Sequence, residues 1–449
     1  MTASQPPGST GLPGLGETLA FVKDPFGFIQ ERRARYGRVF RTSLLGRSTA
    51  ILTGPEPIEA FYDPQNVMRN GGNPSNVQTL FGGTDVINNL DGSAHLRRKE
   101  SVSAALSREA IDAYVPVLTR FIDEAFARWT SEAEIVWNNE LKRLAIETLG
   151  AVFASLESGP DLVVLVKRCE AIAAAFTALP IPLPGTAFSK GARAKDEALA
   201  YYRNLVRAHR ERTYDDGLAR MLAARTRDGT TIADEDAPGE LHHLFLAGYI
   251  VFAQFAATIV HLTERPDVRD RLAASVATLS DAPSAAELAA NAYLIRVVDE
   301  VRRLTPVVPF VIGKSRRSFV VDGFVIPAGW MVAAAVWTND REAASFSDPE
   351  RFDPERFGER AEQAAHPYAY TPQGAGPSDG HRCPGFDLTT VFMALFATRL
   401  VRGFRWVLPA QNLTPNWTVI PPVPRDGLRA IVRPLNQRGP NGDRELPLP

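Results

Sequence analysis

The stretch that decides the fold runs from residue 373 to residue 385 and reads Gln373-Gly-Ala-Gly-Pro-Ser-Asp-Gly-His-Arg-Cys383-Pro-Gly385. It places one cysteine on a glycine-rich loop, directly before an apolar run, 386–401, whose pattern predicts a helix. Backbone N–H groups and the positive end of that helix are expected to lower the pKa of the Cys383 thiol and hold it as a thiolate. Gly376 and Gly385 allow the backbone to lie close to a flat ring, because no Cβ intervenes.

A lone thiolate suits few kinds of site. The chain has 2 cysteines, and the other, Cys169, is distant in sequence, so a tetrahedral zinc site is not expected. A thiolate can be the axial ligand of a haem iron, to which it donates electron density. The alternative is an ordinary buried cysteine. Cys169 lies in a helical pattern, 162–176, and is assigned to packing.

Two further motifs stand upstream of the cysteine loop. Glu300-Val-Arg-Arg303 places a carboxylate and a guanidinium three residues apart on one helix face, where they can pair, and Pro354-Glu-Arg-Phe357 supplies Arg356. In this order the three motifs resemble the cytochrome P450 family, and the resemblance covers nearly the whole chain. It implies the mainly α cytochrome P450 fold with a smaller β-rich lobe, haem b (iron protoporphyrin IX) held by Cys383, and a buried triad of Glu300, Arg303 and Arg356.

Length alone would suggest two or three domains, whereas the resemblance implies one continuous unit with a helical and a β-rich lobe. The chain has 449 residues, is 45% hydrophobic and carries a net charge of −1, which argues against nucleic acid as a partner. Residues 1–16, rich in Pro, Gly, Ser and Thr, are expected to be a flexible arm, and 17–449 a single haem-thiolate domain. Leu45-Gly46-Arg47 and Asp322-Gly323 predict hairpin turns. The expected β-rich lobe comprises about 37–55, 308–336 and 404–432, and the helical lobe about 97–305 and 386–402.

Residues 244–262 contain no Asp, Glu, Lys or Arg and are long enough to cross a membrane. The alternative is a helix that is apolar all round because it runs through the core. We expect the buried helix, since no basic flank marks a membrane end and the resemblance places the helix that crosses the haem face here. The chain starts without a signal-peptide pattern, so a cytoplasmic protein without a membrane span is expected. The resemblance implies electrons from a separate ferredoxin and reductase, or hydrogen peroxide in their place.

Three side chains are candidates for binding the haem propionates. His95 and Lys99 are four residues apart and share a helix face, and His381 stands two residues before Cys383. The resemblance implies that His95 and Lys99 hold one propionate through charge-assisted hydrogen bonds, and that His381 holds the other. The alternative for the first pair is a solvated basic face.

Three short sequence motifs narrow the resemblance to one branch of the family. Leu80-Phe-Gly82, the run from Leu90 to Lys99 and Gly380-His-Arg-Cys-Pro-Gly385 are similar to the bacterial branch that includes fatty-acid peroxygenases and decarboxylases. That branch carries an Arg-Pro pair in the long helix, which grips a fatty-acid carboxylate. The pair falls on Leu246-Ala247 here, so a carboxylate would lack its bidentate partner. Fatty-acid peroxygenase chemistry is therefore in doubt.

The usual pattern for oxygen activation is also altered. Monooxygenases of the family carry Ala-Gly-x-(Asp/Glu)-Thr in this helix, whose acid and alcohol relay protons. Ala247-Gly-Tyr-Ile250-Val251 matches the frame, but Ile250 and Val251 cannot donate a proton. Ala247, Ile250, Val251 and Gln254 have the spacing of one helix face. Gln254 either hydrogen-bonds substrate or water, or satisfies backbone groups in the core.

Three functions remain open on this basis. The first is an oxidoreductase of secondary metabolism, either a monooxygenase or a peroxide-using enzyme, acting on a hydrophobic small molecule. The second is an oxygen-independent isomerase, cyclase or dehydratase, for which a dry distal face excludes water. The third is a non-catalytic haem protein. The residues expected to line the substrate pocket are apolar: Leu80, Phe81, Val307, Val308 and Val311.

Overall fold

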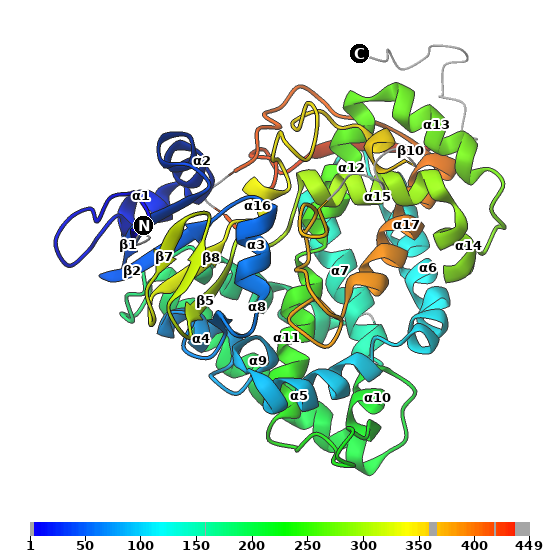
Figure 1. Cartoon of the computed structure of the whole chain (residues 1–449). Coiled ribbons are helices and arrows are strands. Elements are labelled where there is room, and N and C mark those ends of the chain that lie inside the picture. Colours follow the sequence, from blue (N-terminus) through cyan, green and yellow to red (C-terminus); the bar gives the residue numbers. More distant parts are fainter. Residues whose placement is uncertain (1–3, 158, 359–365, 417–418, 436–449) are drawn as a thin grey trace.

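The computed structural model describes residues 4–157, 159–358, 366–416 and 419–435. Figure 1 shows a β-rich part beside the N-terminus and a larger part built of helices. The α-helices are α1 Thr18–Lys23, α2 Pro25–Tyr36, α3 Pro55–Tyr62, α4 Ser75–Phe81, α5 Gly92–Ala104, α6 Arg108–Ser131, α7 Trp137–Ala154, α8 Pro160–Phe176, α9 Ala187–Glu211, α10 Gly217–Ala223, α11 Ala237–Tyr249, α12 Phe252–Glu264, α13 Pro266–Val276, α14 Ala285–Ala290, α15 Ala292–Leu304, α16 Val336–Asn339 and α17 Phe386–Gly403. Two short 3₁₀ helices are η1 Ile87–Asn89 and η2 Pro354–Phe357.

The β-rich part contains a five-stranded sheet in the order β1-β2-β8-β5-β3 and a β6–β7 hairpin. Both predicted hairpin turns are confirmed. Leu44 pairs with Arg47, so Leu45 and Gly46 form a two-residue turn, and Asp322-Gly323 does the same between β6 and β7. All four turn residues have positive φ, which matches the twist of the flanking strands. The strands of these two sheets are β1 Val39–Leu44, β2 Arg47–Leu52, β3 Val67–Met68, β5 Val311–Ser315, β6 Phe319–Val321, β7 Phe324–Ile326 and β8 Met331–Ala334.

The C-terminal strands do not belong to that lobe, which corrects the expected grouping of 404–432 with it. β9 Phe404–Val407 and β10 Arg429–Pro434 join β4 Ile135–Val136 in a separate three-stranded sheet. Ala430 and Val432 are buried in the same apolar core as the helices. The reason is local, because β9 follows α17 directly and stays against the helical part.

The N-terminal arm also differs from the expectation of a loose segment. Arg41 donates its backbone N–H to the carbonyl oxygen of Pro7 at 2.8 Å, and Glu17 donates to that of Ser43 at the same distance. The edge of β1 thus offers the preceding chain hydrogen-bond partners, and a polar composition alone does not reveal them.

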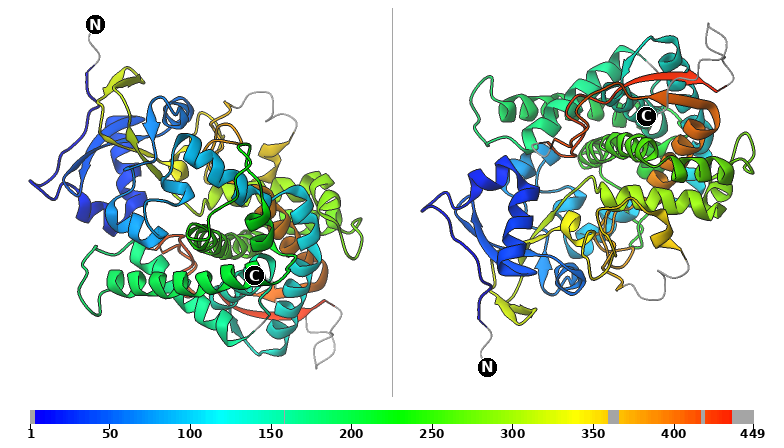
Figure 2. Two further views of the ribbon diagram at one scale, coloured as in Figure 1. Left: turned by 90° about the horizontal axis from the view of Figure 1, so that it is seen from below. Right: turned by 90° about the horizontal axis from the view of Figure 1, so that it is seen from above.

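One helical segment runs through the middle of the helical part. Ala237–Glu264 is, among the described residues, the stretch long and apolar enough to cross a membrane, and 67% of its most apolar window is buried within the protein. Figure 2 shows it in green, seen down its axis and surrounded by other helices. The sequence pattern predicted one regular helix here, but the structure shows two. α11 ends at Tyr249 and α12 begins at Phe252, because Val251 donates to the carbonyl of Gly248, a tighter 3₁₀-type bond, at 3.2 Å.

Candidate active site

Cys383 lies on a largely apolar cavity between its own loop and α11. On the helix side the cavity is lined by Ala247, Gly248 and Val251, and on the loop side by Cys383 and Gly385. Ala247 is exposed although it belongs to a core helix, because its methyl group faces this space. The other lining residues are Ile87, Val102, Leu106, Leu118, Thr148, Leu149, Val152, Phe153, His243, Leu244, Gln373, Pro384, Leu388, Thr389 and Phe392.

The loop that carries Cys383 is fixed by its own backbone. The Cys383 N–H donates to the carbonyl of Gln373 at 3.0 Å, and the Gln373 side-chain amide lies 3.8 Å from the Cys383 Sγ atom. Gly374 and Gly376 have φ values of 85° and 87°, a conformation that L-residues with a Cβ rarely adopt. A Cβ on Gly374 would lie 3.0 Å from the carbonyl oxygen of His381. The glycines therefore shape the loop as well as leaving room beside it.

The expected lowering of the Cys383 pKa is wrong for the protein chain by itself. Burial raises the pKa of the Cys383 thiol, and this outweighs the opposing effects of the Gly385 backbone N–H and the Lys99 ammonium group. A cation bound at the sulfur would oppose this effect of burial, because it deprotonates a coordinating thiol. Burial likewise raises the pKa of Cys169, to about 12, in keeping with a packing role on α8.

The glutamate–arginine triad forms between α15 and η2. Glu300 and Arg303 are fully buried, and Arg303 donates to both Glu300 carboxylate oxygens, at 2.7 and 2.9 Å. Arg356 of η2 donates to Glu300 at 2.9 Å, and the backbone N–H of Asp353 donates at the same distance. The triad ties α15 to the segment that leads to the cysteine loop.

Lys99 lies differently from the expectation that it holds a propionate. Its buried ammonium group donates to the carbonyl oxygens of Gly380 and, at 2.6 Å, of Arg382. Burial lowers the pKa of Lys99 to about 8. The i, i+4 spacing with His95 is therefore kept, but the longer side chain reaches the loop backbone and anchors it.

His95 and His381 do come together, and an arginine that the sequence did not single out joins them. The centroids of the two imidazole rings are 4.0 Å apart, and His381 Nε2 lies 3.6 Å from an Asp91 carboxylate oxygen. Burial lowers the pKa of His95 to about 3 and also lowers the pKa of His381. Arg69 is buried next to them and lowers both values further.

The guanidinium of Arg69 has no carboxylate partner among the residues that the structure describes. It donates to the carbonyl of Ile312 at 3.3 Å and covers the ring of Phe61, with its carbon 4.3 Å from the ring centroid. The Asp91 carboxylate accepts from the Arg69 backbone N–H at 3.0 Å and partly offsets the lowering of the Arg69 pKa by burial, but it does not bond the guanidinium itself. A buried guanidinium without a bonded counter-ion is costly. The cluster of Arg69, His95 and His381 therefore suits an anion such as a carboxylate.

The face of α11 is split by the break between the helices. Ala247 and Val251 line the cavity, whereas Ile250 packs partly buried against the apolar core. Gln254 is buried away from the cavity lining, and its amide points to the carbonyl of Thr305 at 3.5 Å. The tighter turn rotates α12 relative to α11, so the four residues do not share one face. Gln254 thus serves the backbone, one of its two predicted roles.

The residues expected to line the substrate pocket separate into different places. Leu80 is fully buried and packs with Leu246, and Phe81 lies against that cluster. Val307 is buried, Val308 is 40% exposed, and Val311 packs in a different cluster within the β-rich part. None of the five is among the described residues that line the cavity with Cys383.

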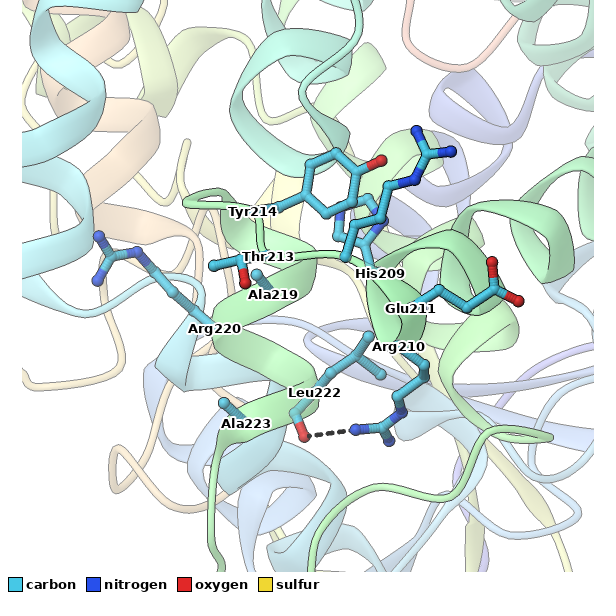
Figure 3. A pocket seen from close by; sticks show the side chains of 10 residues that line it. His209, Arg210, Glu211, Thr213, Tyr214, Ala219, Arg220, Leu222 and Ala223 are labelled. Carbon is cyan, nitrogen blue, oxygen red and sulfur yellow. Dashed lines mark hydrogen bonds between the residues drawn. The ribbon is translucent and has the colours of Figure 1, made fainter.

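A second hollow lies on the surface between the end of α9 and α10. Figure 3 shows the ring of Tyr214 beside His209, and Arg210 donating to the carbonyl of Leu222 at 3.3 Å. The ring centroids of His209 and Tyr214 are 3.9 Å apart. The hollow is open and lined by charged side chains, so it does not resemble the apolar cavity at Cys383.

A cysteine that faces an apolar cavity, with the basic cluster of Arg69, His95 and His381 elsewhere around the same loop, is an arrangement that suits a haem-thiolate protein. The chain belongs to the cytochrome P450 family, whose model matches residues 6–424. It is 29% identical over 445 residues to cytochrome P450 120 of Synechocystis sp., covering 96% of this chain and 97% of the relative. It is 26% identical to a beta-amyrin 28-monooxygenase of Solanum lycopersicum, covering 94% and 91%.

Solved structures agree with the family. The chain matches retinoic acid bound cyanobacterial CYP120A1 with a TM-score of 0.89 and 28% identity, over 97% of this chain and 100% of that one. It matches cytochrome P450SP alpha (CYP152B1) in complex with (R)-ibuprophen with a TM-score of 0.81 and 24% identity, over 93% and 98%. At that identity the second match shows the fold alone. The protein is therefore a haem-dependent oxidoreductase with the cytochrome P450 fold.

Proposed function

We propose that this protein oxidises a hydrophobic small molecule at a haem b held by Cys383, without the acid–alcohol pair of the long helix. The observation that carries the proposal is the placement of Cys383 across an apolar cavity from Ala247 and Val251. The relatives support it, because retinoic acid and beta-amyrin, named with two of them, consist largely of hydrocarbon.

The residues present fit the cofactor. Cys383 would bind the haem iron, and Arg69, His95 and His381 would hold the propionates through charge-assisted hydrogen bonds. Lys99 holds the loop that carries Cys383. When bound, the haem supplies the redox chemistry, and thiolate ligation favours cleavage of an O–O bond. The protein supplies a cavity whose apolar walls exclude water and hold the substrate.

Protons cannot come from the positions that the family normally uses. Val251 is 5% exposed and lines the cavity, and Ile250 packs against the core, so neither places a donor on α11 beside Ala247. A positioned proton donor typically contributes 10²–10⁴ in rate. We therefore expect protons to arrive through water or the substrate, and slow, poorly coupled turnover with dioxygen.

The apolar side of the cavity formed by Ala247 and Val251 also favours the second candidate, an oxygen-independent isomerase, cyclase or dehydratase. A carbocation or a rearranging intermediate survives only where water is excluded, and the wall at Ala247 and Val251 has no polar side chain. The electron source for the first candidate is a separate ferredoxin and reductase or hydrogen peroxide. A cytoplasmic location without a membrane span is part of the proposal, and the burial of Ala237–Glu264 supports it.

The test compares native product from the parent and from the double variant Ile250→Glu, Val251→Thr, with dioxygen and reductant, with peroxide, and with neither. For an ordinary hydroxylase the variant matches or exceeds the parent. If the reaction requires an apolar surface that excludes water, the variant should lose the native product. Fast, tightly coupled, oxygen-dependent hydroxylation by the parent would contradict the proposal that the missing pair limits oxygen chemistry.

A further inference from the structure

A histidine side chain on α11 faces the cavity and makes no hydrogen bond with the residues that the structure describes. His243 lies on α11, one turn before Ala247, and lines the same cavity as Cys383. Its Nδ1 atom is buried and has no hydrogen-bond partner among the described residues. A buried ring nitrogen without a partner costs free energy that a hydrogen bond would recover. The His243 ring as a whole is partly accessible where it lines the cavity, so it presents a hydrogen-bonding group to a molecule bound there.

Three other polar side chains of the lining each donate a hydrogen bond within the protein. The Thr148 hydroxyl donates to the carbonyl of Leu144 at 2.7 Å, and that of Thr389 to the carbonyl of Gly385 at 2.8 Å. The Gln373 amide points at the Cys383 sulfur. The Oε1 atom of Gln373 also has no partner among the described residues, but Gln373 lies on the loop beside the sulfur, whereas His243 lies on α11. Most of the remaining lining is aliphatic, aromatic or glycine.

Its neighbour on the helix shows the contrast. His242 is buried and its Nε2 contacts the carbonyl oxygen of Leu80 at 2.9 Å, so that imidazole is satisfied by the fold. The His243 ring instead lies 5.7 Å from the ring of Phe81 on α4, centroid to centroid. Adjacent histidines on one helix point about 100° apart, which places one in the packing and the other in the cavity.

We infer that His243 is the substrate-orienting residue of this enzyme, and that it hydrogen-bonds an uncharged hydroxyl or carbonyl group on an otherwise apolar substrate. The inference rests on the proposed function. Burial lowers the pKa of His243 to about 4, so the imidazole is neutral at neutral pH and offers one donor and one acceptor. No Lys or Arg is among the described residues that line the cavity. A carboxylate there would be desolvated without a cation, which disfavours a charged substrate group.

The experiment measures binding of three probes with the same chain length, dodecane, dodecanol and dodecanoic acid, to the ferric haem-loaded protein at pH 7. Binding is followed by the spin-state difference spectrum and by calorimetry. A neutral hydrogen bond contributes roughly 3- to 10-fold in affinity, so the parent should bind dodecanol about that much tighter than dodecane, and tighter than dodecanoic acid. His243→Leu should abolish the preference for the alcohol, and His243→Gln should restore part of it. His261→Leu, on α12 and outside the cavity lining, is the matched control and should keep it.

Equal affinity for dodecanol and dodecane in the parent, or a preference that survives in His243→Leu, would overturn the inference. Tighter binding of the acid, or no binding of any of the three probes, would likewise overturn it. Failure of the proposed function has a different signature, which is a parent protein without the thiolate spectrum of the reduced carbon monoxide complex.

Discussion

Replacing Glu300 by Gln should remove a large share of the stability of the folded protein. The Glu300 carboxylate is fully buried and accepts three hydrogen bonds from Arg303 and Arg356 and one from the backbone of Asp353, all at 2.7 to 2.9 Å. The amide keeps the shape but removes the charge, which leaves two guanidinium groups facing each other without a counter-ion. Breaking a buried ion pair in this way costs about 3–5 kcal/mol, against a total stability of about 5–15 kcal/mol for a typical domain.

The assay is urea unfolding of the haem-loaded protein, followed by far-ultraviolet circular dichroism and by haem absorbance. Glu124→Gln is the matched control, because Glu124 pairs with Arg120 at 3.3 Å on an exposed helix face, where such a pair contributes about 0.3–0.5 kcal/mol. Because the triad ties α15 to η2, Glu300→Gln should also lower haem occupancy. A loss no greater than that of Glu124→Gln, with full haem occupancy, would refute the reasoning.

Three further predictions concern the groups around the cofactor and one buried carboxyl. Arg69→Gln and His95→Ala should each weaken haem retention by about 1.5–3 kcal/mol, measured by haem transfer to apomyoglobin, and unchanged transfer rates would contradict the propionate assignment. Gln373→Leu removes the amide that faces the sulfur, so the reduction potential in a dye-coupled titration should fall, because hydrogen bonds to the ligand sulfur stabilise the reduced state; an unchanged potential would count against that contact. Burial raises the pKa of Glu240 from 4.5 to about 7, so the folded state holds this proton more tightly, and the stability that it confers is lost as the pH rises from about 4.5 through 7. Glu240→Gln should therefore flatten the pH dependence of the urea midpoint between pH 5 and 8, and a parent without such a slope would refute this.

The sequence predicts best what local spacing determines. The two hairpin turns follow from residues that accept positive φ, and the pairing of Glu300 with Arg303 follows from positions three apart on a helix. Cys383 could be assigned because a glycine-rich loop and a following apolar helix surround it in sequence. In these cases the interacting groups are neighbours along the chain or belong to a motif with a fixed order.

The rest depends on contacts between distant segments. Lys99 has the spacing expected of a propionate ligand, but the position of the cysteine loop, more than 280 residues later, decides that its ammonium group binds carbonyl oxygens. Arg69 follows a two-residue strand and carries no motif, so only its burial beside His95 and His381 reveals it. His243 directly precedes the apolar run of the long helix, and a free polar group at the edge of such a run is the one signal that could have found it.

The most direct test of the central claim is the absorption spectrum of the reduced carbon monoxide complex of Cys383→Ser, compared with that of Cys169→Ser. Cys169 is buried on α8 and serves as the control, because its replacement removes a thiol outside the cavity lining. The account predicts that Cys169→Ser keeps the long-wavelength Soret band that marks thiolate ligation, and that Cys383→Ser loses it. A Cys383→Ser protein that still shows this band would contradict the assignment of Cys383 as the iron ligand.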